Sequence, residues 1–561
     1  MFFWLLVLLG NGIEQDSVAI DSIQIKRFEI PEIIDFGNTG VLDSSLSQTR
    51  VIEPVLFLNE FKEFTFFTPY LIRDQGYSLE IKSPHKQKVL LHSHYLDNYF
   101  IENFNFVSLP VNFLRPLRLR KMTADESIRN LEIDTRVNIY DQPYSCLYFS
   151  IFGGNKYNLD FTRAITNFMG FYLGGLYSRQ YKNSDHRYLR TNAGYANFYY
   201  NQLIPSRIDI IYTDNNYDNF HNLKFSDITL TTGNDFYKIS AFRTANGSTY
   251  LDTTSDTSLK NQLTTYGANQ RIMFSLRGCE NIIGLDASTS TFKFDSDNSL
   301  SNEQIDFYQK VNYGLNRLTA GLGYRITYET DRSVYFNPDV RLKYSLFDES
   351  GVFGRLKRFY DRANFVARFG NENLTEKFIN ISGNPDIKDE EYLHGEIGVD
   401  VKNSVFSFYH SEITNQIVYQ EDSSGHFSAV NIEKNNVSGL EGFFEMPIWK
   451  WFSIGGTFNY LLKSEIYDLF PKTTLKFWLN AQRKTERSLV CFFTRFNYVS
   501  ERNDIAGNHY KQYWTMSPGL SIKFITLDLG MILENVLNES AGDFPNMERR
   551  FSSEVKWEFW D

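Results

Sequence analysis

Apolar and polar residues alternate with a period of two through most of the chain. Between Leu318 and Glu329, every even-numbered residue is apolar or aromatic, and every odd-numbered residue is Thr, Gly, Arg or Glu. Successive side chains of a β-strand point to opposite faces, so this pattern predicts a strand with one apolar face and one polar face. The same alternation recurs at 340–347, 395–402, 452–462 and 551–559.

Short polar segments rich in Asn, Asp, Ser and Gly separate these runs. They are predicted as the connections of a string of hairpins, at 213–219, 295–304, 421–426 and 500–509. A soluble sandwich or propeller would also alternate. However, a propeller shows a self-similar blade repeat, which this sequence lacks, and a sandwich seldom carries such long alternations through so much of a chain.

The length of the runs indicates what the apolar face contacts. A membrane-spanning strand needs about 9 to 11 residues, with an apolar outward band and aromatic residues at both interfaces. Backbone groups in hydrocarbon must all be paired, so such strands have to close into a barrel. We therefore predict that the apolar faces contact lipid and that Arg325, Glu329, Arg341 and Lys343 face the lumen.

Composition supports β-structure and narrows the function. Aromatic residues make up 16% of the chain, with 35 Tyr and 50 Phe, whereas the strand breaker Pro occurs only 14 times. The formal net charge is −10 and basic residues are interspersed among acidic ones, which argues against nucleic-acid binding. Cys146, Cys279 and Cys491 lie far apart and form neither a disulfide framework nor a CxxC site, so we interpret them as small strand residues.

The N-terminus has the features of a signal peptide. Phe2 to Leu9 is an apolar run too short for a transmembrane helix, and Gly10 and Gly12 supply small residues at the spacing of a cleavage site. The run lacks the usual basic residues before it, and a buried N-terminal strand is the alternative. No other segment is apolar for long enough to predict a spanning helix, so a membrane location requires strands.

No catalytic motif is found in the sequence: it has no GxSxG, HExxH, P-loop or dinucleotide-binding fingerprint. We therefore expect no enzymatic activity and no cofactor, although composition alone leaves open a catalytic cluster of Ser, Asp or Glu at the rim of the barrel. Trp449 and Trp451 flank Lys450 between two strands, which suits an interfacial aromatic belt better than a ligand-stacking box.

Two sets of residues suggest metal binding. His92 and His94 are two positions apart on an expected strand and so face the same way, which would allow them to share a metal ion. The alternative is a pair of polar residues on a solvated strand. The segments at 213–219 and 295–298 are rich in oxygen ligands but lack the spacing of an EF-hand, so polar surface loops are the alternative to calcium sites.

The C-terminal segment carries the most specific family resemblance. ENVLNESAGDFPNMERRFSSEVKWEF (534–559) is similar to the last hairpin of TonB-dependent outer-membrane receptors, with an Asn-Leu-x-Asn element, a Pro loop, an Arg and a closing aromatic strand. The matching positions are Asn535, Leu537, Asn538, Pro545, Arg550 and Phe559. Trp560 and Asp561 follow the closing aromatic residue, which departs from the family pattern.

Two earlier segments also resemble this family. Residues 383–390 are similar to its G-N-P-x-L-x-P-E stretch through Gly383, Asn384, Pro385 and Ile387, while Asp389 stands where Pro is usual. Residues 435–465 resemble the next element, in which an Asn and a Gly-x-Glu sequence, here Gly439 and Glu441, precede a strand whose inward residues reach the lumen.

The resemblance weakens toward the N-terminus. Residues 75–121 look like the core of the plug that family members carry inside the barrel, and Val107, Leu109 and Pro110 fit its apolar-Pro element. However, His92 and Ser93 replace the usual Asp-Gly, and the Gly-rich segment expected before residue 129 is missing. Glycines allow plug backbone to approach the wall closely, so their loss implies a reduced plug. Residues 16–23 have the mixture of polar residues, Val and Ile, and the position near the N-terminus, that are typical of the family's energy-coupling box. Any short acidic N-terminal tail would look similar.

The resemblance implies an all-β fold, a transmembrane antiparallel β-barrel of about 22 strands with a small N-terminal α/β plug domain in the lumen. We expect a signal peptide at 1–12, a reduced plug at 13–134 and the barrel at 135–561. The implied protein is a monomer in the outer membrane of a diderm bacterium, in contact with outer-membrane lipid.

The function implied by the resemblance is that of a receptor and transporter. Such a protein binds a scarce small solute, such as a siderophore, cobalamin or an oligosaccharide, and takes it up with energy from a TonB-like periplasmic protein. The sequence does not select the solute or its contact residues. The missing Gly-rich segment leaves a second hypothesis, in which the barrel is a passive pore or a structural or adhesive surface protein.

Overall fold

The fold is taken from a computed structural model of the chain. It describes residues 71–74, 77–80, 87–91, 94–95, 118–120, 129–133, 143–151, 154–181, 188–217, 221–234, 236–252, 257–276, 278–294, 298–330, 334–347, 350–361, 363, 368, 381–401, 404–421, 427–464, 471–485, 487–503, 509–538 and 549–560. The predicted signal peptide, the segment at 16–23, Pro110 and Pro545 lie outside these residues.

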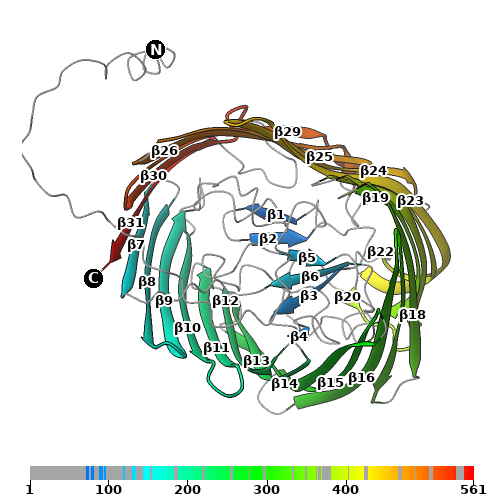
Figure 1. The fold of residues 1–561 in the computed structure, drawn as a ribbon. Helices are drawn as coiled ribbons and strands as arrows, with labels where there is room; N and C mark the ends of the chain where they lie inside the picture. Colours follow the sequence, from blue (N-terminus) through cyan, green and yellow to red (C-terminus); the bar gives the residue numbers. More distant parts are fainter. Residues whose placement is uncertain are drawn as a thin grey trace, which may run out of the picture.

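Twenty-two antiparallel strands close into a barrel. Figure 1 shows the ring that these strands form. Each strand pairs with the next one along the chain, and the last strand pairs back with the first, from Trp560 beside Tyr144 to Ser553 beside Ile151. A closed sheet has no free edge, so every strand finds backbone partners on both sides. The prediction of an all-β, 22-stranded antiparallel barrel is confirmed.

The barrel strands have the following bounds. They are β7 (Tyr144–Ile151), β8 (Gly154–Thr166), β9 (Met169–Tyr181), β10 (Tyr188–Tyr200), β11 (Ser206–Tyr217), β12 (His221–Gly233), β13 (Tyr237–Asp252), β14 (Thr257–Leu276), β15 (Cys279–Phe294), β16 (Asn298–Leu315), β17 (Leu318–Glu329), β18 (Tyr335–Phe347), β19 (Ser350–Asp361), β21 (Glu390–Val401), β22 (Ser404–Glu421), β23 (Phe427–Trp449), β24 (Phe452–Lys463), β25 (Thr473–Lys484), β26 (Ser488–Val499), β29 (Tyr513–Phe524), β30 (Leu527–Glu534) and β31 (Arg550–Trp560).

Three short strands lie in connections between barrel strands. β20 (Ile381–Ser382) pairs in parallel with β23, while β19 and β21 pair directly with each other, so β20 does not add a strand to the barrel. β27 (Arg502–Asn503) and β28 (His509–Tyr510) form a separate hairpin between β26 and β29.

Burial alternates along the strands as the sequence pattern predicts. In β17, Leu322 is 58% exposed whereas Arg325 is 2% exposed, and Thr327 and Glu329 are also buried. The same holds in β21, where Ile397, Val399 and Val401 are exposed and the residues between them are less so. The apolar side chains therefore cover the outside of the barrel, and the polar side chains line its lumen.

The two ends of the barrel differ. At one end, which we call the turn end, strands from β8 onward are joined by connections of two to five residues, and β31 ends beside the start of β7. At the opposite end, the loop end, the longest connections are 362–389 and 535–549. Trp449 and Trp451 lie at the turn end with exposed, stacked rings 5.6 Å apart, which fits the predicted aromatic belt.

Some strands are longer than the sequence pattern indicates. Residues 213–217 and 298–304, predicted as connections, belong to β11 and β16, so that prediction is wrong in part. The physical reason is that a strand which extends past the apolar band is solvated on its outer face, and its sequence then contains the polar residues that mark a turn. Cys146, Cys279 and Cys491 all lie in strands as free thiols, as predicted.

Two smaller sheets lie within the ring of barrel strands in Figure 1. β1 (Leu71–Asp74) pairs with β2 (Tyr77–Glu80). A second sheet, which we call the lumen sheet, has the order β4-β3-β6-β5 and consists of β3 (Gln87–Leu91), β4 (His94–Tyr95), β5 (Arg118–Arg120) and β6 (Arg129–Ile133). Within the described part of the chain, no helix is long and apolar enough to cross a bilayer.

The outward position of Leu322 gives a test of the lipid-facing assignment. Leu322→Arg is expected to lower the free energy of unfolding by about 2 to 4 kcal/mol, because it places a charge on the lipid side near the middle of β17. The measurement is a urea titration of the protein folded into phospholipid vesicles. Thr319→Arg, on the lumen side of the same strand, is the control and should change stability little; equal losses for the two variants would contradict the assignment.

Candidate functional site

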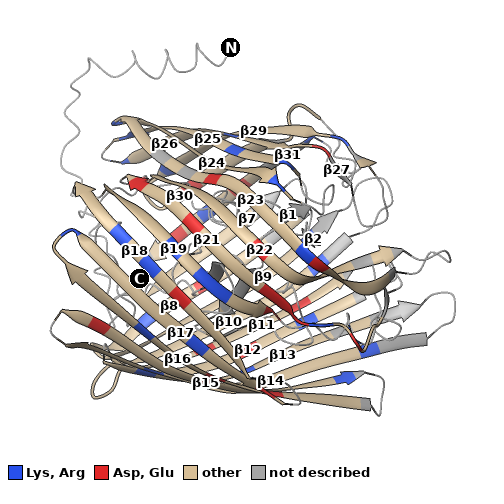
Figure 2. Cartoon of the chain, turned by 90° about the vertical axis from the view of Figure 1, so that its right-hand side faces the viewer, with Lys and Arg blue, Asp and Glu red and all other residues tan. Residues whose placement is uncertain are grey.

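The lumen wall contains paired charges. Figure 2 shows basic and acidic residues interspersed over the barrel strands, rather than segregated by sign. On β18 and β19, Arg355 donates to both carboxylate oxygens of Asp339 at 3.0 and 2.9 Å, and Arg341 donates to the same carboxylate at 3.1 Å. On β16 and β17, Arg325 and Asp306 are 3.0 Å apart. These contacts pair charges that are removed from solvent, which offsets the cost of burying them.

The hairpin of β22 and β23 extends beyond its neighbours at the loop end. β21 pairs with β22 only as far as Thr414, and β24 pairs with β23 only from Ser438 onward. Asn415 lies at this boundary with a positive φ of 56°, a conformation that Asn tolerates better than most residues. The pairing of β22 with β23 skips Asn415 and keeps the same register on both sides of it. Residues 415–421 and 427–437, which we call the projecting hairpin, therefore extend past the neighbouring strands.

The G-N-P stretch packs against this projecting hairpin. We call residues 381–389 the rim segment, and it begins with the parallel pairing of β20 to β23. Asn384 then donates from Nδ2 to the carbonyl of Ala429 at 3.1 Å, while its own Oδ1 accepts from the amide of Asp386 at 3.0 Å. Gly383 and Pro385 flank Asn384, and Pro385 is exposed. The side chain of Asn384 thus both shapes the turn and attaches it to the barrel.

Lys388 is held by its backbone to the projecting hairpin. Its amide donates to Oδ1 of Asn431 at 2.7 Å, and Nδ2 of Asn431 donates back to its carbonyl at 3.0 Å. The same Nδ2 donates to the carbonyl of Asn415 at 2.7 Å. One amide side chain therefore joins both strands of the hairpin to the rim segment.

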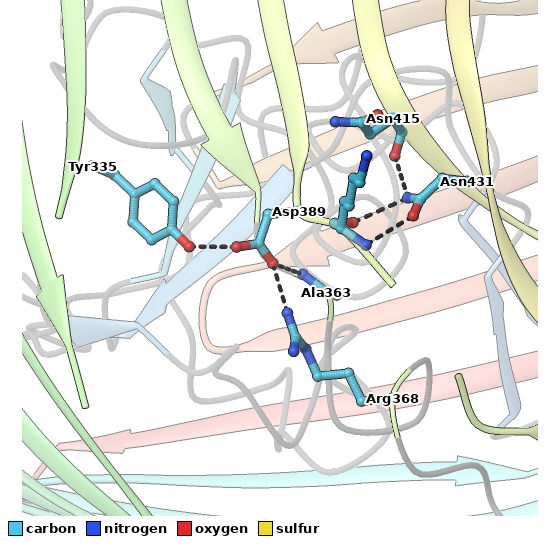
Figure 3. Close-up of polar contacts among 7 residues, drawn as sticks. Tyr335, Ala363, Arg368, Asp389, Asn415 and Asn431 are labelled. Atoms are coloured by element: carbon cyan, nitrogen blue, oxygen red, sulfur yellow. Dashed lines mark hydrogen bonds and ion pairs between the residues drawn. The ribbon is translucent and has the colours of Figure 1, made fainter. Parts of the chain in front are cut away.

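Asp389 gathers three donors at the end of the rim segment (Figure 3). Its carboxylate accepts from the hydroxyl of Tyr335, from the amide of Ala363 at 2.8 Å and from Nη2 of Arg368 at 3.3 Å. These donors come from β18 and from the long connection after β19. Asp389 occupies the position where the resembled family has Pro, and a Pro side chain accepts no hydrogen bond. The departure from the pattern therefore replaces a rigid residue with a polar anchor.

Apolar contacts complete the attachment of the rim segment. Ile387 is buried in a cluster with Ala363 and Ala429, and Ile417 packs against them. Directly after the segment, Glu390 accepts a hydrogen bond from the amide of Ile417 at 2.6 Å. The rim segment is thus fixed by hydrogen bonds and burial, and it gives the mouth of the barrel a defined edge.

The other residues matched to the family lie in the wall or in turns. Glu441 is buried and accepts from Ser407 at 3.2 Å. Asn535 and Asn538 both have positive φ in the turn after β30, where the amide of Asn538 donates to the carbonyl of Asn535 and its Oδ1 accepts from the amide of Arg549, each at 2.9 Å. These contacts indicate structural roles.

The closing strand carries the last two matched residues. Arg550 is the first residue of β31 and pairs with Glu534. Phe559 pairs with Ser145 across the seam, and its ring lies 4.7 Å from that of Trp557. The structure therefore places the matched residues in three regions, namely the rim, the wall of β23 and the closing hairpin, and does not bring them into one site.

The imidazole of His94 forms hydrogen bonds with the barrel wall. Its Nε2 lies 3.0 Å from Oδ1 of Asp227 on β12 and 3.3 Å from the hydroxyl of Thr244 on β13. Among the described residues, no group of three or more His, Cys, Asp or Glu is arranged to hold a metal ion, and His92 lies outside them. The geometry thus assigns His94 a role as a hydrogen-bond donor to a carboxylate.

Sequence reasoning missed the partners of these residues. Tyr335, Asn431 and Asp227 lie far along the chain from Asp389, Lys388 and His94, and only the three-dimensional fold brings them together. One signal was available for Asp227: a carboxylate at an inward position between Phe225 and Thr229 is costly unless it is paired. Its partner could not be named from the sequence.

Comparisons with known proteins agree with this architecture. Residues 93–532 match the family described as "TonB dependent receptor-like, beta-barrel". A search of curated proteins finds no match. Among solved structures, the siderophore receptor PirA from Acinetobacter baumannii has a TM-score of 0.69 at 12% identity, over 86% of this chain and 91% of that one.

Two further solved structures have similar values. A variant of the ferric enterobactin receptor PfeA from Pseudomonas aeruginosa, in complex with enterobactin, has a TM-score of 0.71 at 13% identity, over 85% of this chain and 92% of that one. The FrpB iron transporter from Neisseria meningitidis has a TM-score of 0.67 at 12% identity, over 84% of this chain and 92% of that one. At these identities, the likeness concerns the fold.

The anchoring role of Asp389 leads to a prediction. Asp389→Ala is expected to speed amide exchange at Ile387 and Lys388 by about 10- to 100-fold, because it removes hydrogen bonds to a charged group. Hydrogen–deuterium exchange on the purified barrel measures this. Asp386→Ala, in the same segment but with an exposed side chain, is the matched control. Unchanged exchange in the Asp389 variant would show that the other contacts of the rim segment fix it without Asp389.

The position of Gly439 leads to a second prediction. A Cβ there would lie 2.3 Å from the hydroxyl oxygen of Tyr409 and 2.8 Å from the carbonyl of Tyr460, so Gly439→Ala should cost about 1 to 3 kcal/mol in unfolding free energy. Gly395→Ala, where a Cβ meets nothing within 4 Å, is the control. In combination with Tyr409→Ala, the Gly439→Ala loss should shrink; simple additivity of the two losses would refute the proposed clash.

Proposed function

The chain belongs to the TonB-dependent receptor β-barrel family, and on this premise we propose that it takes up a ferric siderophore across the outer membrane. In this proposal, the solute binds at the loop end and passes through the lumen, with energy from a TonB-type periplasmic protein. The family is one of receptors and transporters, not of enzymes.

The observation that carries the proposal is a 22-strand barrel with a sheet inside its ring. A barrel of this size encloses a wide lumen, and in large outer-membrane transporters the lumen is plugged. A sheet inside the barrel suits gated uptake, because it can seal the lumen and be displaced. The matched region begins at residue 93, within the sequence of the lumen sheet, and so is not confined to the barrel.

The choice of solute rests on the structural neighbours. They include receptors for siderophores and for ferric enterobactin, and an iron transporter. Cobalamin and oligosaccharides are the other solute classes considered. Binding at the loop end is supported by the rim segment, since a fixed edge at the mouth costs less ordering entropy when it contacts a ligand than a free loop would.

The outer membrane is proposed as the location because the outward strand positions form an apolar surface, with residues such as Leu322, Leu342 and Ile397 more than half exposed. Lipid is the medium that suits such a surface. A monomer is sufficient, since the sheet closes on itself and needs no second chain to cover an edge.

The proposal predicts energy-dependent iron uptake. Gram-negative cells that lack their own siderophore receptors and express this chain should accumulate radioactive iron supplied as ferric siderophore, because the barrel offers a path and the TonB system supplies the energy. Uptake of cobalamin and of labelled oligosaccharides is measured in the same cells, which identifies the solute class. Filtration and counting over time give the rate.

Cells without a functional TonB system provide the control, and iron uptake in them should fall to background. The conductance of the purified protein in a planar bilayer supplies an independent reading, and it should be low while the lumen is sealed. Uptake that persists without TonB, together with high conductance, would overturn the proposal in favour of a passive pore.

A further inference from the structure

His94 connects the lumen sheet to the barrel wall. It lies in β4, the edge strand of the lumen sheet, where it pairs with Leu91 of β3. Its Nε2 is 3.0 Å from Oδ1 of Asp227, a residue 133 positions later in β12 of the barrel. Both side chains are shielded from solvent. This side-chain pair therefore links two sheets that are separate in their backbone pairing.

The barrel wall forms a shaped receptor for this imidazole. The hydroxyl of Thr244 donates to Oδ1 of Asp227 at 2.7 Å, and that of Thr229 donates to Oδ2 at 2.8 Å. Both hydroxyls come from the barrel, so the carboxylate is oriented without help from the lumen sheet. The ring of Phe242 stacks on the imidazole with centroids 4.1 Å apart and planes 11° apart. The wall thus supplies an oriented hydrogen-bond acceptor, the carboxylate of Asp227, and an aromatic ring, that of Phe242, on which the imidazole stacks.

The energetics of this contact favour complete engagement or complete release. A hydrogen bond to a buried carboxylate is strong because the surroundings are of low polarity. A small displacement of the sheet would break the bond before water could enter, which leaves a buried donor and acceptor apart and unsatisfied. Once the sheet has moved far enough for water to reach Asp227, that penalty disappears. The contact therefore resists small movements and offers little resistance to large ones.

We propose that the His94–Asp227 pair is a latch that holds the lumen sheet against the barrel wall, and that its release is a required step in opening the lumen. This inference rests on the proposed function, in which the lumen opens for a solute. β3 and β4 are adjacent both in the chain and in the sheet, so a pull on the chain before Gln87 reaches His94 through the pairing of Leu91 with it. His94 and Asp227 are positioning residues, not contacts for the solute.

The latch is tested by hydrogen–deuterium exchange on the full-length purified protein, read at the amides of β3 and β6. His94→Ala and Asp227→Asn should each speed exchange there by about 10- to 100-fold, the range expected for loss of a hydrogen bond to a charged group. The double variant should be no faster than either single variant, because both remove the same contact. His94→Gln, which retains an N–H donor, should recover part of the protection.

Controls separate the latch from general damage to the barrel. Asp528 on β30 is another buried carboxylate of the wall, and its hydrogen-bond partner Ser521 also belongs to the barrel. The control variant Asp528→Asn should therefore leave amide exchange in β3 and β6 unchanged. His94 lies outside the barrel strands, so its variants leave barrel closure intact, and gel mobility of the unheated protein checks this.

The outcomes distinguish the latch from the proposed function. Coupled protection by His94 and Asp227 supports the latch even if no siderophore is taken up, in which case the transport proposal alone fails. Exchange that is unchanged in both single variants, or effects that simply add in the double variant, overturns the latch even where uptake is observed.

Discussion

The requirement that every backbone N–H and C=O in hydrocarbon finds a partner within the protein determines the rest of this structure. Strands meet it only by closing on themselves, and here the seam between β31 and β7 completes the circle. Antiparallel order follows from joining neighbours through short connections at one end. Closure also divides every strand into an outer and an inner face, so the alternation in the sequence becomes a division between lipid and lumen.

The inner face has a requirement that the outer face lacks, namely hydrogen-bond or ion-pair partners for its polar side chains. Polar side chains that point inward and lose contact with water must be paired, and the wall does this across strands, as with Arg325 and Asp306 or Arg355 and Asp339. The same rule applies where other parts of the chain meet the wall. Asp389 at the rim and Asp227 in the lumen are both carboxylates whose donors come from more than one element.

The sequence predicts those parts of the structure that depend on neighbouring residues. Period-two alternation in β17 and β21 gave the strands, their facing and the barrel, because side-chain direction in a strand is set by parity alone. The alternation does not predict the partners of Asp389 or His94, because these contacts depend on how a connection and a separate sheet pack against the barrel. The sequence around His94 suggests a metal ligand or a solvated residue, and neither interpretation includes the buried carboxylate that it contacts.

The rim and the lumen sheet use similar bonds to opposite effect, and the difference lies in what surrounds the bonds. The rim segment is continuous with β21, pairs with β23 through β20, buries Ile387 and bonds through Asn384, so loss of one contact leaves several others in place. At His94, by contrast, one donor meets a carboxylate that the wall already orients. Several contacts of different kinds make the mouth of the barrel a fixed edge, whereas the buried His94–Asp227 bond is lost as a whole once the sheet has moved far enough for water to enter. A transporter that must hold its entrance still while it clears its lumen would need this division.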